Sequence, residues 1–517
     1  MKSIRKKVFV SFLSMMVVSS ILAGCGNKAT QGNTPAVSST PVELKVEVFD
    51  RGKPGQSPVD NNYWTKWIQD NFGKKNNITM KFVAVPRSQE VDKLNIMMAS
   101  NQVPDIVFTY DQNIVYNYVK QGGLTELDSL LTKYGPNLKK YLGNDLLNYG
   151  TFNGKLYSII AKRMFLGDRA GYIRQDWLDK LGMPTPKTTE EFYKTMVAFR
   201  DKNPGGVKNV VPVGASSSLI ISNLQDSFIN GITEEQLATL PSWKQPGYKD
   251  AIQFLNKLYN EKLLSPEFAI DKDGKKFDAD IAQGNTGFFG QNMDYALRTN
   301  PGDYNALKKV VPTAKLVPID TFTTKDGKYR KDLYSQNGIF LLIPKSSKRA
   351  VEVIKYLDWM VKTENTFFLE NGEEGVHHKL VDGIPQLLPV EGDKAINSTY
   401  NIDYDLIHNG VELGDPKKNL LALAKTYIGY EAEAKQAMAI STKDGYTNFW
   451  YNTPLEQGAK YAKILADKST EMNAKLVTAK PADFDKLYDS LVDEYMKVGG
   501  QQVMDERITV YKAQTKK

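Results

Sequence analysis

The stretch Val42–Asp50, VELKVEVFD, begins the part of the chain that is expected to fold, and it sets the fold class. Its apolar residues alternate with charged ones, which is the pattern of a β-strand with one buried face. A helix near 63–72, a second strand at 78–85, a helix around Leu94 and a buried strand ending at Phe108 are predicted to follow. This alternation of strands and helices predicts an α/β fold with a largely parallel sheet.

The segment before this strand has the pattern of an export signal. A short basic start precedes an uncharged, mostly apolar run from Val8 to Ala23, which is shorter and richer in Ser than a membrane-spanning helix of about 20 apolar residues. The run ends in LAGC at 22–25, which resembles the lipobox of bacterial lipoproteins and implies that the thiol of Cys25 receives a lipid. The alternative is an ordinary buried thiol. We predict a signal peptide over 1–24 and a flexible tether of small and polar residues over 25–41.

Length and charge narrow the class of protein. A chain of 517 residues is too long for a single hydrophobic core, so two or three domains are expected. The net charge of +8 includes the basic residues of the signal, and the remaining small excess is spread along the chain, which argues against nucleic-acid binding. Cys25 is the only cysteine, so a lipidated chain has no thiol left for a disulfide, a metal cluster or catalysis.

Several segments, in their order along the chain, resemble the extracellular solute-binding proteins of bacterial ABC importers. They are LNIMMASNQVPDI at 94–106, QGGLTELDSLL at 121–131, NGKLYSI at 153–159 and IPKSSKRAVEVIKYLDWM at 343–360. The similarity is to the family 1 type, and particularly to long Gram-positive lipoproteins associated with the uptake of complex carbohydrates. It covers essentially the whole mature chain.

The resemblance implies two discontinuous α/β lobes, joined by a hinge of several strands, that close on a ligand. We place the first lobe at 42–162 plus 314–395 and the second at 163–313 plus 396–517. The implied function is the capture of an oligosaccharide by a lipid-anchored, extracytoplasmic monomer and its delivery to an ABC transporter permease. A peptide or another small polar solute is the alternative ligand, and a surface carbohydrate-active enzyme is the less favoured alternative function.

Candidate ligand contacts follow the strands of the first lobe. A sugar needs flat aromatic rings and side chains that form paired hydrogen bonds, and in open α/β sheets such groups gather at the carboxyl ends of strands. Asp50 and Arg51 follow the first strand, and Tyr110 and Asp111 follow VPDIVF. A surface ion pair beside a turn is the alternative for Asp50 and Arg51.

Three charged residues, Arg163, Asp168 and Arg169, lie where the chain is predicted to cross first between the lobes. At such a crossing a charged side chain either contacts the ligand or forms an ion pair between the lobes. The sequence leaves both interpretations open.

Several other residues are candidates because they lie in loops or at the ends of elements. Trp64 lies at the start of a helix, Trp243 lies between two prolines, and Phe289 and Gln291 follow the turn QGNTG. Trp450 lies in the aromatic loop GYTNFWYN, before a helix predicted to begin at Thr453. For any one aromatic residue, packing in a core is the alternative.

No catalytic residue, metal site or cofactor is predicted. The chain has three histidines, no G-x-S-x-G and no H-E-x-x-H. Many relatives carry an acidic calcium loop after the helix that ends here at Arg200, but the corresponding stretch 201–209 has one carboxylate and two lysines. The stretch Asp271–Gly274 begins like a calcium loop, but Lys275 and Lys276 follow it, so we interpret it as a turn.

Overall fold

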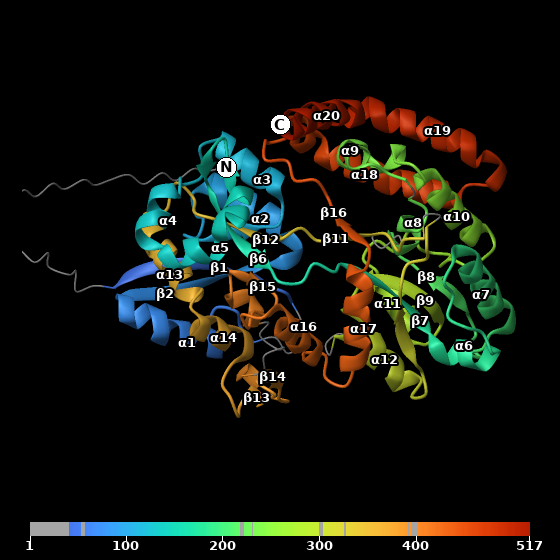
Figure 1. Cartoon of the computed structure of the whole chain (residues 1–517), viewed down its shortest axis with the longest axis horizontal. Coiled ribbons are helices and arrows are strands. Elements are labelled where there is room, and N and C mark those ends of the chain that lie inside the picture. Colours follow the sequence, from blue (N-terminus) through green and yellow to red (C-terminus); the bar gives the residue numbers. More distant parts are fainter. Residues whose placement is uncertain are drawn as a thin grey trace, which may run out of the picture. The chain divides into compact units, whose positions relative to one another are not determined.

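Two four-stranded sheets with separate hydrophobic cores form the two lobes of the chain (Figure 1). The computed structural model describes residues 41–52, 57–217, 222–229, 231–298, 303–324, 327–390, 392–394 and 401–516. The predicted signal peptide, Cys25 and the tether up to residue 40 lie outside these residues. Among the described residues, no helix has the length and apolar character needed to cross a membrane.

The sheet of the first lobe combines parallel and antiparallel pairs. Its order is β15-β6-β12-β3, and β12 runs antiparallel to both of its neighbours. Its strands are β3 (Val107–Thr109), β6 (Ser158–Arg163), β12 (Asn337–Leu342) and β15 (His408–Asn409). Beside it, β1 (Val42–Asp50) pairs in parallel with β2 (Ile78–Pro86) along its whole length. The predicted strand at 42–50 is therefore present, and the parallel order is broken where the chain returns from the second lobe as β12.

Helices pack around this sheet and bury a core of aliphatic and aromatic side chains. They are α1 (Tyr63–Ile68), α2 (Glu90–Ser100), α3 (Gln112–Lys120), α4 (Asp128–Tyr134), α5 (Pro136–Tyr149), α13 (Ala350–Met360) and α14 (Thr363–Asn371). Two hairpins complete the lobe, β4 (Thr151–Phe152) with β5 (Lys155–Leu156) and β13 (His378–Val381) with β14 (Ile384–Leu387).

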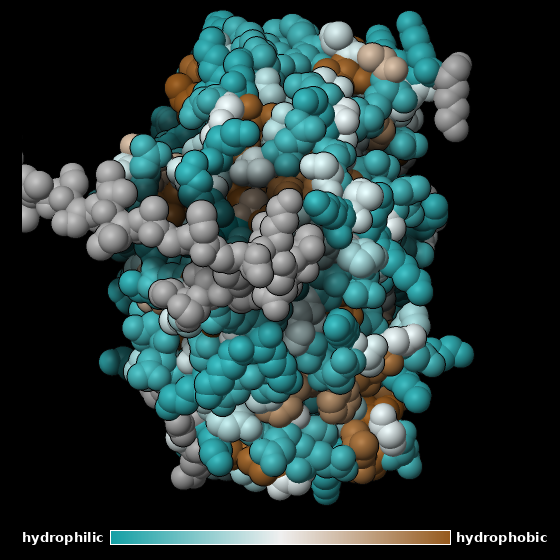
Figure 2. Space-filling view, turned by 90° about the vertical axis from the view of Figure 1, so that its left-hand side faces the viewer, coloured by the Kyte–Doolittle hydropathy of each residue, from teal (hydrophilic) through white to brown (hydrophobic). Residues whose placement is uncertain are grey.

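On the face that Figure 2 shows, hydrophilic side chains predominate and hydrophobic ones occur in small groups.

The sheet of the second lobe has the order β10-β7-β9-β8, and only the pair β8–β9 is parallel. Its strands are β7 (Arg169–Arg174), β8 (Val211–Gly214), β9 (Thr286–Asn292) and β10 (Leu316–Ile319). The first group of its helices is α6 (Gln175–Leu181), α7 (Thr189–Lys202), α8 (Ser222–Asp226), α9 (Glu234–Thr239), α10 (Tyr248–Asn260), α11 (Lys275–Ala282) and α12 (Asp303–Val310). The C-terminal group is α16 (Pro416–Lys425), α17 (Glu431–Thr442), α18 (Glu456–Thr478), α19 (Phe484–Tyr495) and α20 (Gln501–Thr515).

The chain passes between the lobes after β6, again before β12, and again after β15. A short parallel pair, β11 (Lys331–Leu333) with β16 (Gly445–Thr447), lies among these crossings. The positions of the crossings differ from the predicted boundaries in two places. Strand β10, predicted for the first lobe, pairs with β7 of the second, and residues 403–409, predicted for the second lobe, supply β15 and buried side chains to the first. Hydrophobicity indicates that a strand is buried, but it does not indicate which sheet the strand joins.

Candidate functional site

Polar and aromatic side chains gather where β1 and β3 end. Arg51 donates from Nε and Nη2 to the two carboxylate oxygens of Asp403, at 2.7 and 2.6 Å. The guanidinium of Arg87 lies 4.9 Å from the ring centroid of Tyr110. Burial raises the pKa of Tyr110, while the charges of Arg51 and Arg87 act in the opposite direction. Two of the separately proposed candidates, Arg51 and Tyr110, thus lie in one group, with two partners that the sequence analysis did not name, Arg87 and Asp403.

The two acidic candidates of this region have local roles in the backbone. Asp50 accepts a hydrogen bond from the N–H of Gly52 at 2.9 Å. Asp111 is the N-cap of α3 and accepts from the N–H of Asn113 at 2.8 Å. Such caps satisfy backbone donors that a helix leaves open. Both carboxylates thus accept from nearby backbone N–H groups, and the ion pair considered for Arg51 is formed with Asp403 and not with Asp50.

The first crossing carries the three charged candidates of the hinge. The guanidinium carbon of Arg163 lies 4.1 Å from the ring centroid of Tyr334, and its Nε is buried without a hydrogen-bond partner among the described residues. Asp168 lies 3.6 Å from Nε of Arg169, and its Oδ1 is likewise buried without such a partner. Burial lowers the pKa of Arg163, and burial together with Asp168 raises the pKa of Tyr334. Buried polar atoms that lack partners mark a place where an incoming polar ligand would gain hydrogen bonds.

Residues that the sequence analysis missed extend this group into the second lobe. Asp226 of α8 is buried, Asp332 of β11 is exposed, and Tyr446 of β16 is half-buried. Burial and the nearby carboxylate of Asp332 raise the pKa of Asp226, and Arg169 opposes this rise. Burial and both carboxylates raise the pKa of Tyr446. Only the pairing of β11 with β16, two segments far apart in sequence, could have placed Asp332 and Tyr446 together.

Trp450 lines a cavity of about 400 Å³ beside the crossings. Its ring lies 4.4 Å from that of Tyr149 and is stacked 6.3 Å from that of Phe340, between centroids. Its indole Nε1 is buried and has no hydrogen-bond partner among the described residues. The remaining wall is mostly polar and consists of Asp145, Asn148, Leu166, Ser335, Gln336, Thr447 and Asn448. An aromatic ring in a polar cavity has the composition expected of a sugar site.

Four other candidates are buried in the lobes, which corrects the expectation that they face a ligand. Trp64 is fully buried in the core of the first lobe, and Trp243 is 4% exposed and donates from Nε1 to Ser469 Oγ at 3.1 Å. Phe289 and Gln291 lie on β9, where both faces of the strand are covered by the lobe. These four side chains pack inside the lobes, as the alternative interpretation stated.

The loop after α7 does not fit a calcium ion. Its only carboxylate, Asp201, accepts from Nε of Arg200 at 2.7 Å, and the ammonium of Lys180 donates to the carbonyl oxygen of Pro204 at 2.8 Å. The side chain of Asn203 forms its hydrogen bonds within the loop. Calcium needs six to eight oxygen ligands, so cationic groups at the carboxylate and at a carbonyl leave no such site here.

The stretch that begins at Asp271 forms the start of a helix. The Asp271 carboxylate accepts from the backbone N–H groups of Lys276 and Phe277, at 3.2 and 2.9 Å. These are the first residues of α11, so the carboxylate satisfies donors at the helix start. Asp273 forms an ion pair with Lys275 at 2.6 Å. This arrangement agrees with a turn that leads into a helix.

Comparison with known proteins gives the class of this chain. The family model of bacterial extracellular solute-binding proteins matches residues 55–366, and the chain belongs to this family. Proteins of this family are extracytoplasmic binding proteins, and those of ABC importers work with membrane permeases.

Individual relatives align over nearly the whole chain. Lipoprotein LipO of Bacillus subtilis is 24% identical over 97% of this chain and 98% of its own length. The polygalacturonan/rhamnogalacturonan-binding protein YtcQ of Bacillus subtilis is 25% identical over 96% and 97%. Among solved structures, the S. pneumoniae substrate-binding protein FusA in complex with kestose has a TM-score of 0.66 at 18% identity, covering 92% of this chain and 100% of that one. At this sequence identity, the structural likeness shows that the two proteins share a fold.

Proposed function

We propose that this protein captures an oligosaccharide between its two lobes and delivers it to the permease of an ABC transporter. The relatives support this ligand class, because YtcQ is named for binding polygalacturonan and rhamnogalacturonan and FusA was solved with kestose. We further propose that the protein acts as a monomer, that it performs no chemistry on the ligand, and that a lipid on Cys25 holds it at the membrane. Support for the anchor is the LAGC context of the lone cysteine and the name of LipO.

The observation that carries the proposal is the group of polar side chains at the crossings. Arg163 Nε and Asp168 Oδ1 are each buried without a hydrogen-bond partner in the described part of the chain, beside the ring of Tyr334. A sugar hydroxyl both donates and accepts, so one hydroxyl pair could satisfy a guanidinium and a carboxylate at once. Buried donors and acceptors that remain unpaired cost about 1–3 kcal/mol each, and a ligand that pairs them gains a corresponding affinity.

Closure of the lobes is the step by which such a site would trap its ligand. The residues of the group come from the segment after β6, from the strand pair β11–β16 and from α8, so they lie on elements of both lobes and of the hinge. A ligand that contacts both lobes binds the closed form more tightly and shifts the equilibrium toward it. The permease would then distinguish the loaded form by its geometry.

A thermal-shift screen over neutral and acidic oligosaccharides tests the proposal. At a concentration of 100 times Kd, a ligand that binds only the native state adds about 2.7 kcal/mol of stability and raises the melting temperature by several degrees. Peptides of two to six residues in the same screen test the alternative ligand class, and chromatography of the incubated oligosaccharides tests catalysis. Stabilisation by peptides alone would overturn the proposed ligand, and hydrolysis products would overturn the binding-only function.

A further inference from the structure

Two carboxylates and an imidazole meet in the first lobe, outside the group at the crossings described above. They belong to Glu370 at the end of α14, to Asp405, and to His408 of β15. One possible ligand atom from each residue lies within 4.8 Å of the others. Asp405 and His408 are each 3% exposed, so the group is largely enclosed by protein.

The imidazole of His408 is held in one orientation. Its Nδ1 lies 2.9 Å from Oδ2 and 3.1 Å from Oδ1 of Asp405, and the ring of Tyr141 packs edge-on against it with centroids 4.9 Å apart. An ion bound by all three residues would therefore lie on the Nδ1 side of the ring, in place of the proton that Nδ1 shares with Asp405.

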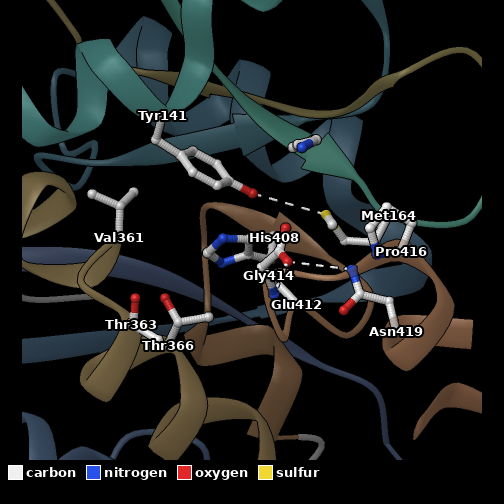
Figure 3. A pocket seen from close by; sticks show the side chains of 11 residues that line it. Tyr141, Met164, Val361, Thr363, Thr366, His408, Glu412, Gly414, Pro416 and Asn419 are labelled. Carbon is white, nitrogen blue, oxygen red and sulfur yellow. Dashed lines mark hydrogen bonds between the residues drawn. The ribbon is translucent and has the colours of Figure 1, made fainter. Parts of the chain in front are cut away.

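A cavity of about 350 Å³ adjoins the group, and His408 forms part of its wall (Figure 3). Figure 3 shows the imidazole below Tyr141 and beside Glu412. The wall also presents oxygen atoms from Thr366 and Asn419. The cavity is large enough to hold ordered water next to the group, and water commonly completes the coordination of a metal ion.

The local charge favours a cation. The backbone N–H of Glu412 donates to both carboxylate oxygens of Glu370, at 3.2 and 2.9 Å, so a third acidic residue lies directly beside the pair. Lys162 lies on the cavity wall, with its Nζ 5.4 Å from the ring centroid of Tyr141. Gathering carboxylates away from water is costly unless a positive charge compensates them, and a divalent ion supplies two charges at one point.

We propose that Glu370, Asp405 and His408 bind a divalent transition-metal ion of the zinc type. The choice of metal follows from the ligands, because neutral imidazole with carboxylates suits Zn²⁺, whereas Ca²⁺ and Mg²⁺ prefer oxygen ligands alone. Two carboxylates and one imidazole are the number of protein ligands that leave a fourth position for water.

The site would stabilise the hinge. His408 lies directly before the third crossing, and Glu370, on α14 of the first lobe, already accepts from the backbone of Glu412 within that crossing. A metal held by both segments would fix the start of the crossing to the first lobe. The proposal is independent of the oligosaccharide function.

The test uses the lipid-free mature chain, produced without a histidine tag and freed of metal by a chelator. Titration with Zn²⁺ should show one equivalent bound and a rise in the melting temperature of several degrees. Ca²⁺ at the same concentration should have no such effect. The variants Glu370→Gln and His408→Gln should weaken Zn²⁺ binding at least tenfold. Glu374→Gln, which changes an exposed acid just after α14, should bind like the wild type.

A measurement on the wild type keeps the test decisive if a variant does not fold. The chain has three histidines, so paramagnetic Co²⁺ should shift the ring NMR signals of the ligand His408 far more strongly than those of His377 and His378. Absence of stoichiometric Zn²⁺ binding would overturn the proposal. Binding that leaves the His408 signals unmoved, or that the folded variants retain, would overturn it as well, and a proton shared by the carboxylates would then remain as the role of the group.

Discussion

Glu47 is the acidic side chain of β1 that turns into the first lobe. It is fully buried, its Oε2 accepts only from the N–H of Phe108 at 3.3 Å, and its Oε1 has no hydrogen-bond partner among the described residues. Burial raises its pKa from 4.5 to about 8, with a further contribution from Glu90. A buried carboxyl of this kind lowers the stability of the folded state, and it lies near the polar group around Tyr110.

The variant Glu47→Gln is expected to be more stable than the wild type at pH 8, by roughly 4 kcal/mol, because the wild type loses about 1.4 kcal/mol for each pH unit between its unfolded and folded pKa values. The folded pKa is raised, so the folded chain keeps the proton while the unfolded chain loses it near pH 4.5. The stability of the wild type therefore falls as pH rises from about 4.5 to about 8, by up to about 1.4 kcal/mol per pH unit, and is level below that window. Urea unfolding at pH 4 and pH 8 measures this, with the exposed Glu43→Gln as control. An equal difference at both pH values would contradict it.

The variant Trp450→Ala is expected to lose about 1–3 kcal/mol of oligosaccharide affinity, because the ring would stack on a sugar face in the cavity that it lines. Calorimetry on the folded variant measures the loss. Trp243→Phe is the matched control, since Trp243 is buried in the second lobe and its change should lower stability without changing affinity. Normal affinity of Trp450→Ala with a loss of stability of about 3–5 kcal/mol would assign Trp450 to packing alone.

At the scale of elements, α18 shows how distant residues complete a helix. At the start of α18, the backbone N–H groups of Gln457 and Gly458 donate to the carboxylate of Glu506 on α20, at 3.0 and 2.9 Å. At its other end, the buried side chain of Asn256 donates to the carbonyl oxygens of Leu476 and of two further residues. The first turn of a helix leaves backbone N–H groups without partners, and the last turn leaves carbonyl oxygens without partners. In α18, side chains of α20 and α10 supply these partners.

The variant Asn256→Ala is therefore expected to lower the free energy of unfolding by about 2–4 kcal/mol, since it leaves several buried carbonyls without a donor. Urea denaturation measures the change. Asn260→Ala is the control, because Asn260 is exposed and shares one acceptor with Asn256, the carbonyl of Ala479. A loss no larger than that of the control would show that water satisfies these carbonyls.

The elements that depend on local sequence could be predicted. The alternating stretch at Val42 forms β1, and a family resemblance gave the two-lobed α/β class, which the structure and the family assignment confirm. The helix predicted to begin at Thr453 begins at Glu456 instead, because its start is capped by Glu506 from α20. Contacts of this kind are set by tertiary packing, which local patterns do not contain.

The candidate site was predictable only in part, for the same reason. Arg51 and Tyr110, each proposed because it follows a strand, lie close together in the structure, since the ends of neighbouring strands meet, and their contact with a ligand stays a prediction. Whether an aromatic side chain faces a core or a cavity depends on the elements that cover it, so Trp64 and Trp243 were misjudged. Asp332 and Tyr446 were missed because only the pairing of β11 with β16 brings them together.

At the scale of the whole molecule, the N-terminal segment is expected to determine whether the protein stays at the membrane, and it is not expected to affect the folding of the lobes. The variant Cys25→Ser is expected to fold and bind ligand as the wild type does but to be lost from the membrane fraction, because Cys25 is the only cysteine and the proposed lipid site. Fractionation of cells followed by a high-salt wash measures retention. Continued membrane retention of the variant would show that the anchor is something other than the lipid.

The binding mechanism rests on the two lobes and the crossings between them. Each lobe has its own sheet and core, so each can move as a unit while the crossing segments absorb the change in backbone angles. The polar group at the crossings draws side chains from both lobes, including Arg163, Asp226 and Asp332. A ligand that satisfies them together would hold the lobes closed.

Small-angle scattering of the lipid-free protein, with and without its most stabilising oligosaccharide, tests this account most directly. Because the ligand is proposed to bind the closed form more tightly, saturation should lower the radius of gyration measurably. Arg163→Ala should need a much higher ligand concentration for the same change, since Arg163 is a proposed ligand contact. An unchanged radius at saturation, with binding verified by calorimetry on the same sample, would contradict capture by closure of the lobes.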